Sequence, residues 1–157
     1  MKIKLLAIGK TDDKQLQSLI ETYQKRLKHY IKFELEIIPD IKNVKNLSEF
    51  QQKEKEGELI IKKLLPTDHL VLLDENGQEF TSIQFSKYLQ KKMNAATKQL
   101  VLVIGGPYGF SETIYKKANG KISFSKMTFS HQMIRLFAVE QVYRAFTILK
   151  NEPYHHQ

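Results

Sequence analysis

Ser123–His131, SFSKMTFSH, is the stretch around which the rest of the sequence is organised. It lies between a short strand-like segment and the most apolar helix-like segment of the chain, and it contains neither glycine nor proline. Exposed loops are usually rich in Gly, Pro, Asn and Asp, and a half-buried strand alternates apolar and polar residues more regularly. We therefore expect an ordered, partly buried loop that wraps a small ligand on a platform formed by the rest of the chain.

The segments on either side of this loop alternate between strand and helix patterns. Short apolar runs predict strands at Lys2–Ile8, Phe33–Ile38, His69–Leu73, Gln99–Ile104 and Lys121–Phe124. Helical spacing and capping patterns predict helices at Lys14–His29, Ser48–Leu65 and Thr81–Asn94, one that starts at Ser111, and one from Ser130 or His131 to about Asn151. This order predicts a single α/β domain over residues 1–157, with a mainly parallel sheet covered by helices on both faces.

Ligands of such sheets bind beyond the carboxyl ends of the strands. Three loops leave those ends in the second half of the chain: Leu73–Gly77, Gly105–Gly109 and Ser123–Ser130. Asp74–Gly77, DENG, is predicted to be a turn. The glycines of IGGPYG allow the backbone to approach a ligand closely, although a tight turn without a ligand is the alternative. The spacing matches neither a Walker loop nor the dinucleotide fingerprint.

The amino-acid composition limits the partners and the reaction types that the chain can have. The net charge is +8, from 22 lysines and three arginines against 17 acids. This balance favours a polyanionic partner such as nucleic acid, with a lysine-rich solvated surface as the alternative. The absence of cysteine excludes disulfides, thiolate metal sites, iron–sulfur clusters and cysteine nucleophiles. We expect no metal, a cytoplasmic location and no membrane span, because no apolar run approaches the ~20 residues that a span needs.

The last helix and the tail are unusual. The helix reads IRLFAVEQVYRAFTILK and is apolar nearly all round, which predicts burial on more than one side and a homodimer across this helix. Glu140 and Arg144 are four residues apart and can pair; alternatively Arg144 faces an RNA phosphate. In the tail NEPYHHQ, Tyr154 can stack on a base, and His155 supplies an imidazole, a side chain that often takes part in proton transfer. A frayed end or the remnant of an affinity tag is the alternative.

Taken together, VLVIGGPYGF, SFSKMTFSHQMIR, EQVYRAF and the terminal PYH resemble, in order and spacing, the methyltransferase H family of the large ribosomal subunit, within the SPOUT superfamily. Its members methylate N3 of a pseudouridine in 23S rRNA, and the resemblance covers the whole chain. It implies S-adenosylmethionine as cofactor, a trefoil knot in the C-terminal half and an obligate homodimer. It places the cofactor on Leu73, Gly105, Phe124, Ser125, Lys126, Met127, Thr128 and Phe129.

The resemblance also implies that the tail of one subunit completes the site of the other. His155 would then be, or would position, the base that removes the N3 proton, and Tyr154 would contact the flipped nucleotide. Arg135 and Arg144 are candidate contacts to RNA phosphate, on a substrate that we expect to be the assembled ribosome. The Lys126 ammonium should point away from the cationic sulfonium.

Two positions depart from the family pattern. Ser130 stands where the family often has proline, and a serine can cap the following helix. His156 stands where a basic residue often follows Tyr-His, which weakens a charge contact between the tail and RNA.

Two other functions stay open: a SPOUT 2′-O-methyltransferase acting on tRNA, although its arginine-bearing motif is not seen, and a basic RNA-binding module without catalysis.

Overall fold

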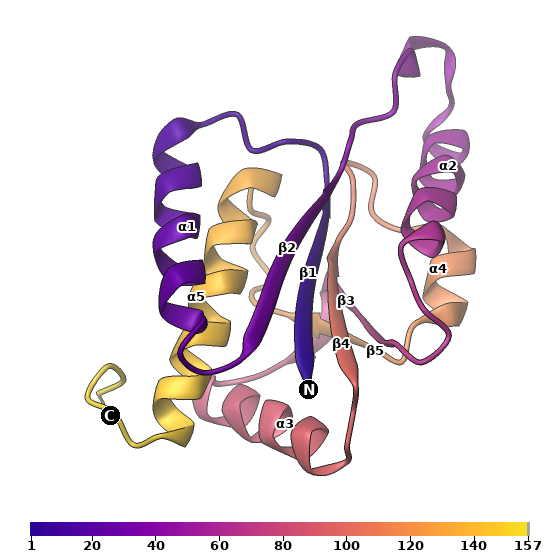
Figure 1. Cartoon of the computed structure of the whole chain (residues 1–157). Helices are drawn as coiled ribbons and strands as arrows, with labels where there is room; N and C mark the ends of the chain where they lie inside the picture. The colour runs from indigo at the N-terminus through magenta and orange to yellow at the C-terminus, as the bar shows by residue number, and fades with distance from the viewer. Residues whose placement is uncertain (157) are drawn as a thin grey trace.

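Five strands form one sheet in the order β2-β1-β4-β3-β5, and every neighbouring pair is parallel (Figure 1). The structure is a computed structural model and describes residues 1–156. The elements are β1 (Lys2–Ile8), α1 (Lys14–Leu27), β2 (Lys32–Ile38), the 3₁₀ helix η1 (Val44–Asn46), α2 (Glu49–Lys62), β3 (His69–Glu79), α3 (Ser82–Asn94), β4 (Gln99–Ile104), α4 (Glu112–Lys117), β5 (Gly120–Ser123) and α5 (His131–Leu149). The predicted α/β class is confirmed.

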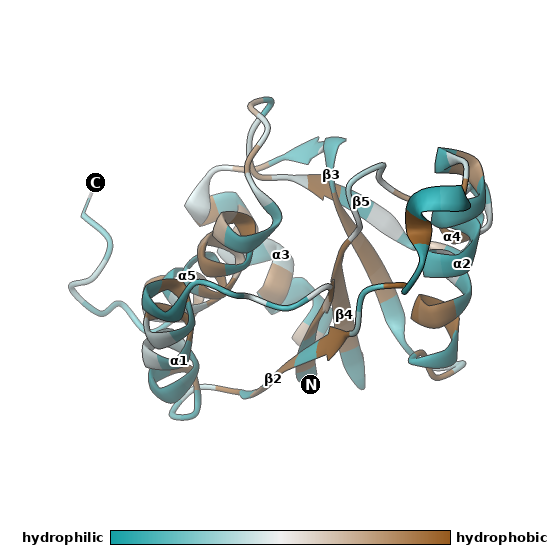
Figure 2. Ribbon diagram, turned by 90° about the horizontal axis from the view of Figure 1, so that it is seen from above, coloured by the Kyte–Doolittle hydropathy of each residue, from teal (hydrophilic) through white to brown (hydrophobic). Residues whose placement is uncertain are grey.

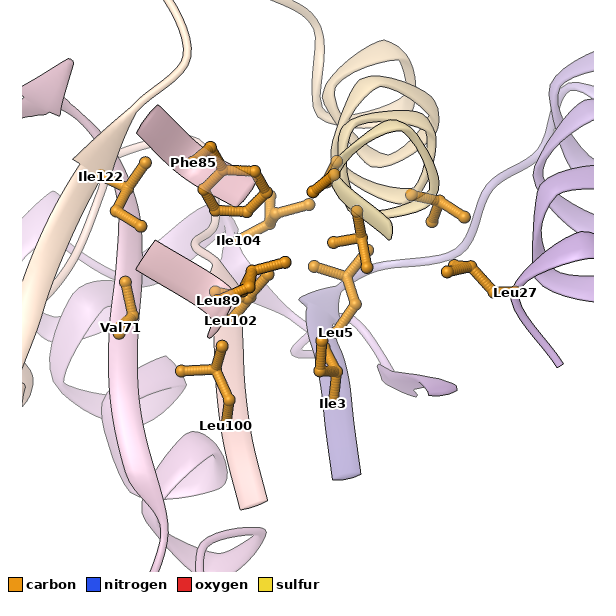
Figure 3. Packing of buried hydrophobic residues seen from close by; sticks show 14 of the residues in the cluster. Ile3, Leu5, Leu27, Val71, Phe85, Leu89, Leu100, Leu102, Ile104 and Ile122 are labelled. Carbon is orange, nitrogen blue, oxygen red and sulfur yellow. The ribbon is translucent and has the colours of Figure 1, made fainter. Parts of the chain in front are cut away.

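Helices cover both faces of the sheet, as predicted. The central strand β4 is buried on both sides, and its side chains alternate between two apolar clusters. Leu100, Leu102 and Ile104 face α1, α3 and α5, where Phe85 packs (Figure 3). The opposite face packs against α2 and α4. Hydrophobic strands between helices with hydrophilic outer surfaces are visible in Figure 2. Among the described residues no helix is long and apolar enough to cross a membrane.

Local capping chemistry sets where the helices begin. The predicted capping boxes at Ser48 and Thr81 are both present, and each serves the first turn of its helix. Ser130 caps α5, because its hydroxyl accepts a hydrogen bond from the amide of Met133 at 3.2 Å. The serine that replaces the family's proline therefore does what was expected of it.

The predicted turn at Asp74–Gly77 is wrong. β3 continues to Glu79, and its pairing with β5 shifts register: Leu73 and Gln78 both lie opposite Ile122. The four residues between them form a bulge at the carboxyl end of the sheet. Gly77 brings this bulge close to β5, since an added Cβ would lie 2.6 Å from the carbonyl carbon of Ile122.

The bulge provides a test of this packing. Gly77→Ala should lower the free energy of unfolding by about 2 kcal/mol, because the methyl group meets backbone that cannot rotate away. Urea denaturation measures the effect. Gly120→Ala is the matched control in the same strand pair, since nothing lies within 4 Å of its added Cβ. Equal stability of the two variants would contradict the close approach of the bulge.

Candidate functional site

A cavity of about 550 Å³ lies beside the β3 bulge and beyond the carboxyl ends of β4 and β5. The sheet register creates it, because Leu73 is paired with both Ile104 and Ile122. The segments that follow these residues are the β3 bulge and the loops after β4 and β5, and they therefore start at the same level and face one another. Residues from all three segments line the cavity, so the expected convergence is confirmed, with a strand bulge in place of the first loop.

Most residues that the resemblance assigned to the cofactor line this cavity. They are Leu73, Gly105, Phe124, Ser125, Met127, Thr128 and Phe129. Met127, which is also among the lining residues, is 75% exposed. Lys126 is exposed and does not line the cavity, in keeping with an ammonium group that points away from it.

The cavity is lined by acidic and not by basic side chains. The β3 bulge contributes Asp74 and Glu75, and the first turn of α2 contributes Glu49. None of the lining residues is a lysine or an arginine. A cavity with this charge favours a cationic ligand. Among the described residues no group of three or more acidic or histidine side chains is placed to hold a metal ion.

Two further lining residues carry polar rings that sequence reasoning missed. The Tyr115 hydroxyl donates to a carboxylate oxygen of Asp74, and burial together with this bond raises the pKa of Tyr115 to about 12. Burial, reinforced by the nearby Arg135 charge, lowers the pKa of His131, so its imidazole is neutral at pH 7. Tyr115 and Glu49 gave no sequence signal. His131 lies two residues after the predicted cofactor run, which was the one available clue.

Arg135 has a different role from the predicted one. Its side chain is 1% exposed and donates to the carbonyl of Ile8 at 2.6 Å and to the hydroxyl of Thr11 at 2.8 Å. The guanidinium thereby ties the end of β1 to the first turns of α5. The structure argues against its predicted contact with RNA phosphate, because the guanidinium is buried and already donates hydrogen bonds within the protein.

The tail packs against its own chain. The Tyr154 hydroxyl donates to Glu140 at 3.0 Å and lies 3.1 Å from the Tyr23 hydroxyl. The predicted Glu140–Arg144 pair is present at 2.6 Å. The Arg144 guanidinium lies 4.7 Å from the ring centroid of Tyr154 and one of its nitrogens lies 3.4 Å from Nδ1 of His155. The tail is thus held in place, and it does not fray in the described residues.

This tail cluster and the cavity are separate within one chain. His131 at the start of α5 lines the cavity, whereas Tyr143, whose ring packs 4.8 Å from that of Tyr154, lies twelve residues further along the helix. That spacing corresponds to about 18 Å along the helix axis. Figure 1 shows the carboxyl terminus beyond the end of α5 that is remote from the strand ends. One chain therefore does not bring Tyr154 and His155 to the predicted cofactor residues.

Comparison with known proteins is decisive for the family. The sequence model of a family described as "Predicted SPOUT methyltransferase" matches residues 1–155. Two relatives called "Ribosomal RNA large subunit methyltransferase H" are 74% identical (Flavobacterium johnsoniae) and 73% identical (Flavobacterium psychrophilum), each over the full length of both chains.

A solved structure of the SpoU methyltransferase AviRb from Streptomyces viridochromogenes, in complex with the cofactor AdoMet, is a more distant match. It has 13% identity and a TM-score of 0.47, and the match covers 91% of this chain and 57% of that one. The assignment therefore depends on the family match and on the full-length relatives: the chain belongs to the SPOUT methyltransferase family.

Proposed function

We propose that this member of a family of S-adenosylmethionine-dependent rRNA methyltransferases methylates N3 of a pseudouridine in 23S rRNA of the assembled ribosome. The observation that carries the proposal is the acidic cavity at the strand ends, lined by seven of the eight predicted cofactor residues. The net charge of +8 suits a polyanionic substrate, and the relatives' name refers to large-subunit rRNA.

The residues of the cavity fit the proposed cofactor. Apolar side chains such as Leu73, Phe124 and Phe129 offer a surface for a flat adenine ring. Gly105 lets the backbone come close to the ligand. The carboxylates of Glu49, Asp74 and Glu75 favour the positive sulfonium electrostatically, and the neutral His131 adds no opposing charge. When bound, the cofactor would supply an electrophilic methyl group.

The methyl acceptor has its own requirement. An imide nitrogen is a poor nucleophile until it loses its proton, so the site needs a group that accepts this proton. We propose His155 for this step, directly or by positioning the base, with Tyr154 contacting the flipped nucleotide. Burial and hydrogen bonds to Tyr23 and Glu140 raise the pKa of Tyr154, which keeps its hydroxyl neutral and able to donate. Arg144 stays a candidate phosphate contact.

Dimerisation would bring the tail to the cavity. Met133, Phe137 and Ile148 are partly exposed on one side of α5 and belong to neither apolar cluster. Beside them lies a groove of about 260 Å³ that is lined by Phe80, Phe124, Phe129 and Phe137. We propose that a second copy packs on this side of α5 and that its tail completes the site. The trefoil knot of the C-terminal half is part of the same proposal.

The catalytic proposal is tested by separating cofactor binding from methyl transfer. His155→Ala should lower methylation of ribosomes by about 100-fold, because a general base contributes that order of rate, while calorimetry should show unchanged S-adenosylmethionine affinity. His29→Ala, at an exposed histidine after α1, is the control. Methylation by His155→Ala at the wild-type rate would show that His155 is not needed for methyl transfer. A wild-type protein without affinity for S-adenosylmethionine would favour the non-catalytic RNA-binding module.

The shared site is tested by co-expressing two inactive chains. Gly105→Val should distort the cavity wall and prevent cofactor binding, since even an added Cβ lies 3.1 Å from the Phe110 ring, and His155→Ala should disable the tail. Mixed dimers contain one site with an intact cavity and an intact tail, so methylation of ribosomes should return when both chains are present. Activity that stays absent in purified mixed dimers would show that each chain builds its site alone.

A further inference from the structure

Glu56 of α2 is a buried acid that the proposed reaction does not use. Its side chain is 3% exposed, and it is the one carboxylate among the buried residues of the described chain. Oε1 accepts a hydrogen bond from Gln52 at 2.9 Å, whereas Oε2 has no hydrogen-bond partner. An unpaired buried polar atom is costly, so the position of this carboxyl needs an explanation.

The carboxyl group packs directly against the glycine turn of the cavity. A Cβ added to Gly106 would lie 2.6 Å from Cδ of Glu56, so no larger residue fits there without displacing the acid. The next residue of the helix makes a second close approach, since a Cβ added to Gly57 would lie 2.6 Å from the Ser111 hydroxyl. Helix α2 is thus in contact with both ends of the segment from Gly106 to Ser111.

This contact lies behind the cofactor residues. Gly105 and Gly106 both line the cavity, and Glu56 does not. The acid therefore contacts the turn from within the α2 layer, where it can fix the backbone without touching the ligand. A side chain that sets the position of the turn sets the shape of the cavity wall.

The surroundings of Glu56 favour the neutral acid. Burial raises its pKa, and the nearby Asp40 carboxylate raises it further, while the hydrogen bond from Gln52 acts in the opposite direction. No lysine or arginine of the described chain forms an ion pair with it. A protonated carboxyl needs no counter-charge and packs against Gly106 as an uncharged group, whereas the carboxylate would be an unpaired buried charge.

We propose that Glu56 is a positioning residue for the cofactor, whose buried carboxyl holds the Gly105–Gly106 turn in the shape that receives S-adenosylmethionine. The proposal rests on the proposed function of the cavity. It implies a pH dependence. The folded protein raises the pKa of the Glu56 carboxyl above its ordinary value of 4.5. The stabilisation that the protonated carboxyl gives is therefore complete below pH 4.5 and is lost as the pH rises through the raised pKa. The affinity for S-adenosylmethionine should fall with rising pH in the same way.

The test is calorimetric titration of S-adenosylmethionine into wild type, Glu56→Gln and Glu58→Gln from about pH 5 to about pH 9. The amide of Gln is uncharged and nearly isosteric, so Glu56→Gln should keep the low-pH affinity throughout, while wild type weakens by about tenfold as Glu56 ionises. Glu58, exposed on the same helix, is the matched control and should follow wild type. Protonation of the cofactor itself affects all three proteins equally, so it cancels when their affinities at one pH are compared as ratios.

Glu56→Ala adds a second measurement, with an expected loss of affinity of about tenfold at every pH because the turn loses its support. If this variant does not fold, the comparison of Glu56→Gln with wild type decides the question. A Glu56→Gln profile that follows wild type, or wild-type affinity in a folded Glu56→Ala, overturns the role of Glu56. Absence of S-adenosylmethionine binding in wild type at every pH would instead refute the proposed function itself.

Discussion

The parallel register of β3 between β4 and β5 is the constraint on which the site depends. Leu73 lies opposite Ile104 on one side and Ile122 on the other, so the β3 bulge and the loops after β4 and β5 begin at one level. These three segments therefore face one another. The buried central strand β4 holds this register, because its side chains fill the core on both faces of the sheet.

Two additions turn this shared edge into a specific cavity. The bulge after Leu73 places Asp74 and Glu75 at the cavity, so two of its three acidic side chains come from an irregularity in a strand. On the other side, α2 packs closely against Gly106 through Glu56 and against Ser111 at Gly57. The ligand-facing wall and its support therefore come from elements far apart in sequence, which are brought together only by the folded sheet.

Local chemistry explains what could be predicted from the sequence. Two strands, Lys2–Ile8 and Gln99–Ile104, have the predicted bounds, and the capping boxes and the cap at Ser130 are local patterns. The bulge was missed because DENG has turn composition, while its strand character depends on pairing with β5. The burial of Arg135 was missed because its partners, the Ile8 carbonyl and the Thr11 hydroxyl, are more than 120 residues away in sequence.

On the proposed function, S-adenosylmethionine binds between the β3 bulge and the loops after β4 and β5, while the tail of the same chain lies apart from it. The most direct measurement is the change in backbone amide NMR shifts when the cofactor is titrated into the protein. We expect the largest changes in residues 73–77, 105–109 and 123–131, which form the β3 bulge and the two loops around the cavity. Largest changes elsewhere, for example at Tyr23 and Glu140 beneath the tail, with the loops unaffected, would contradict it.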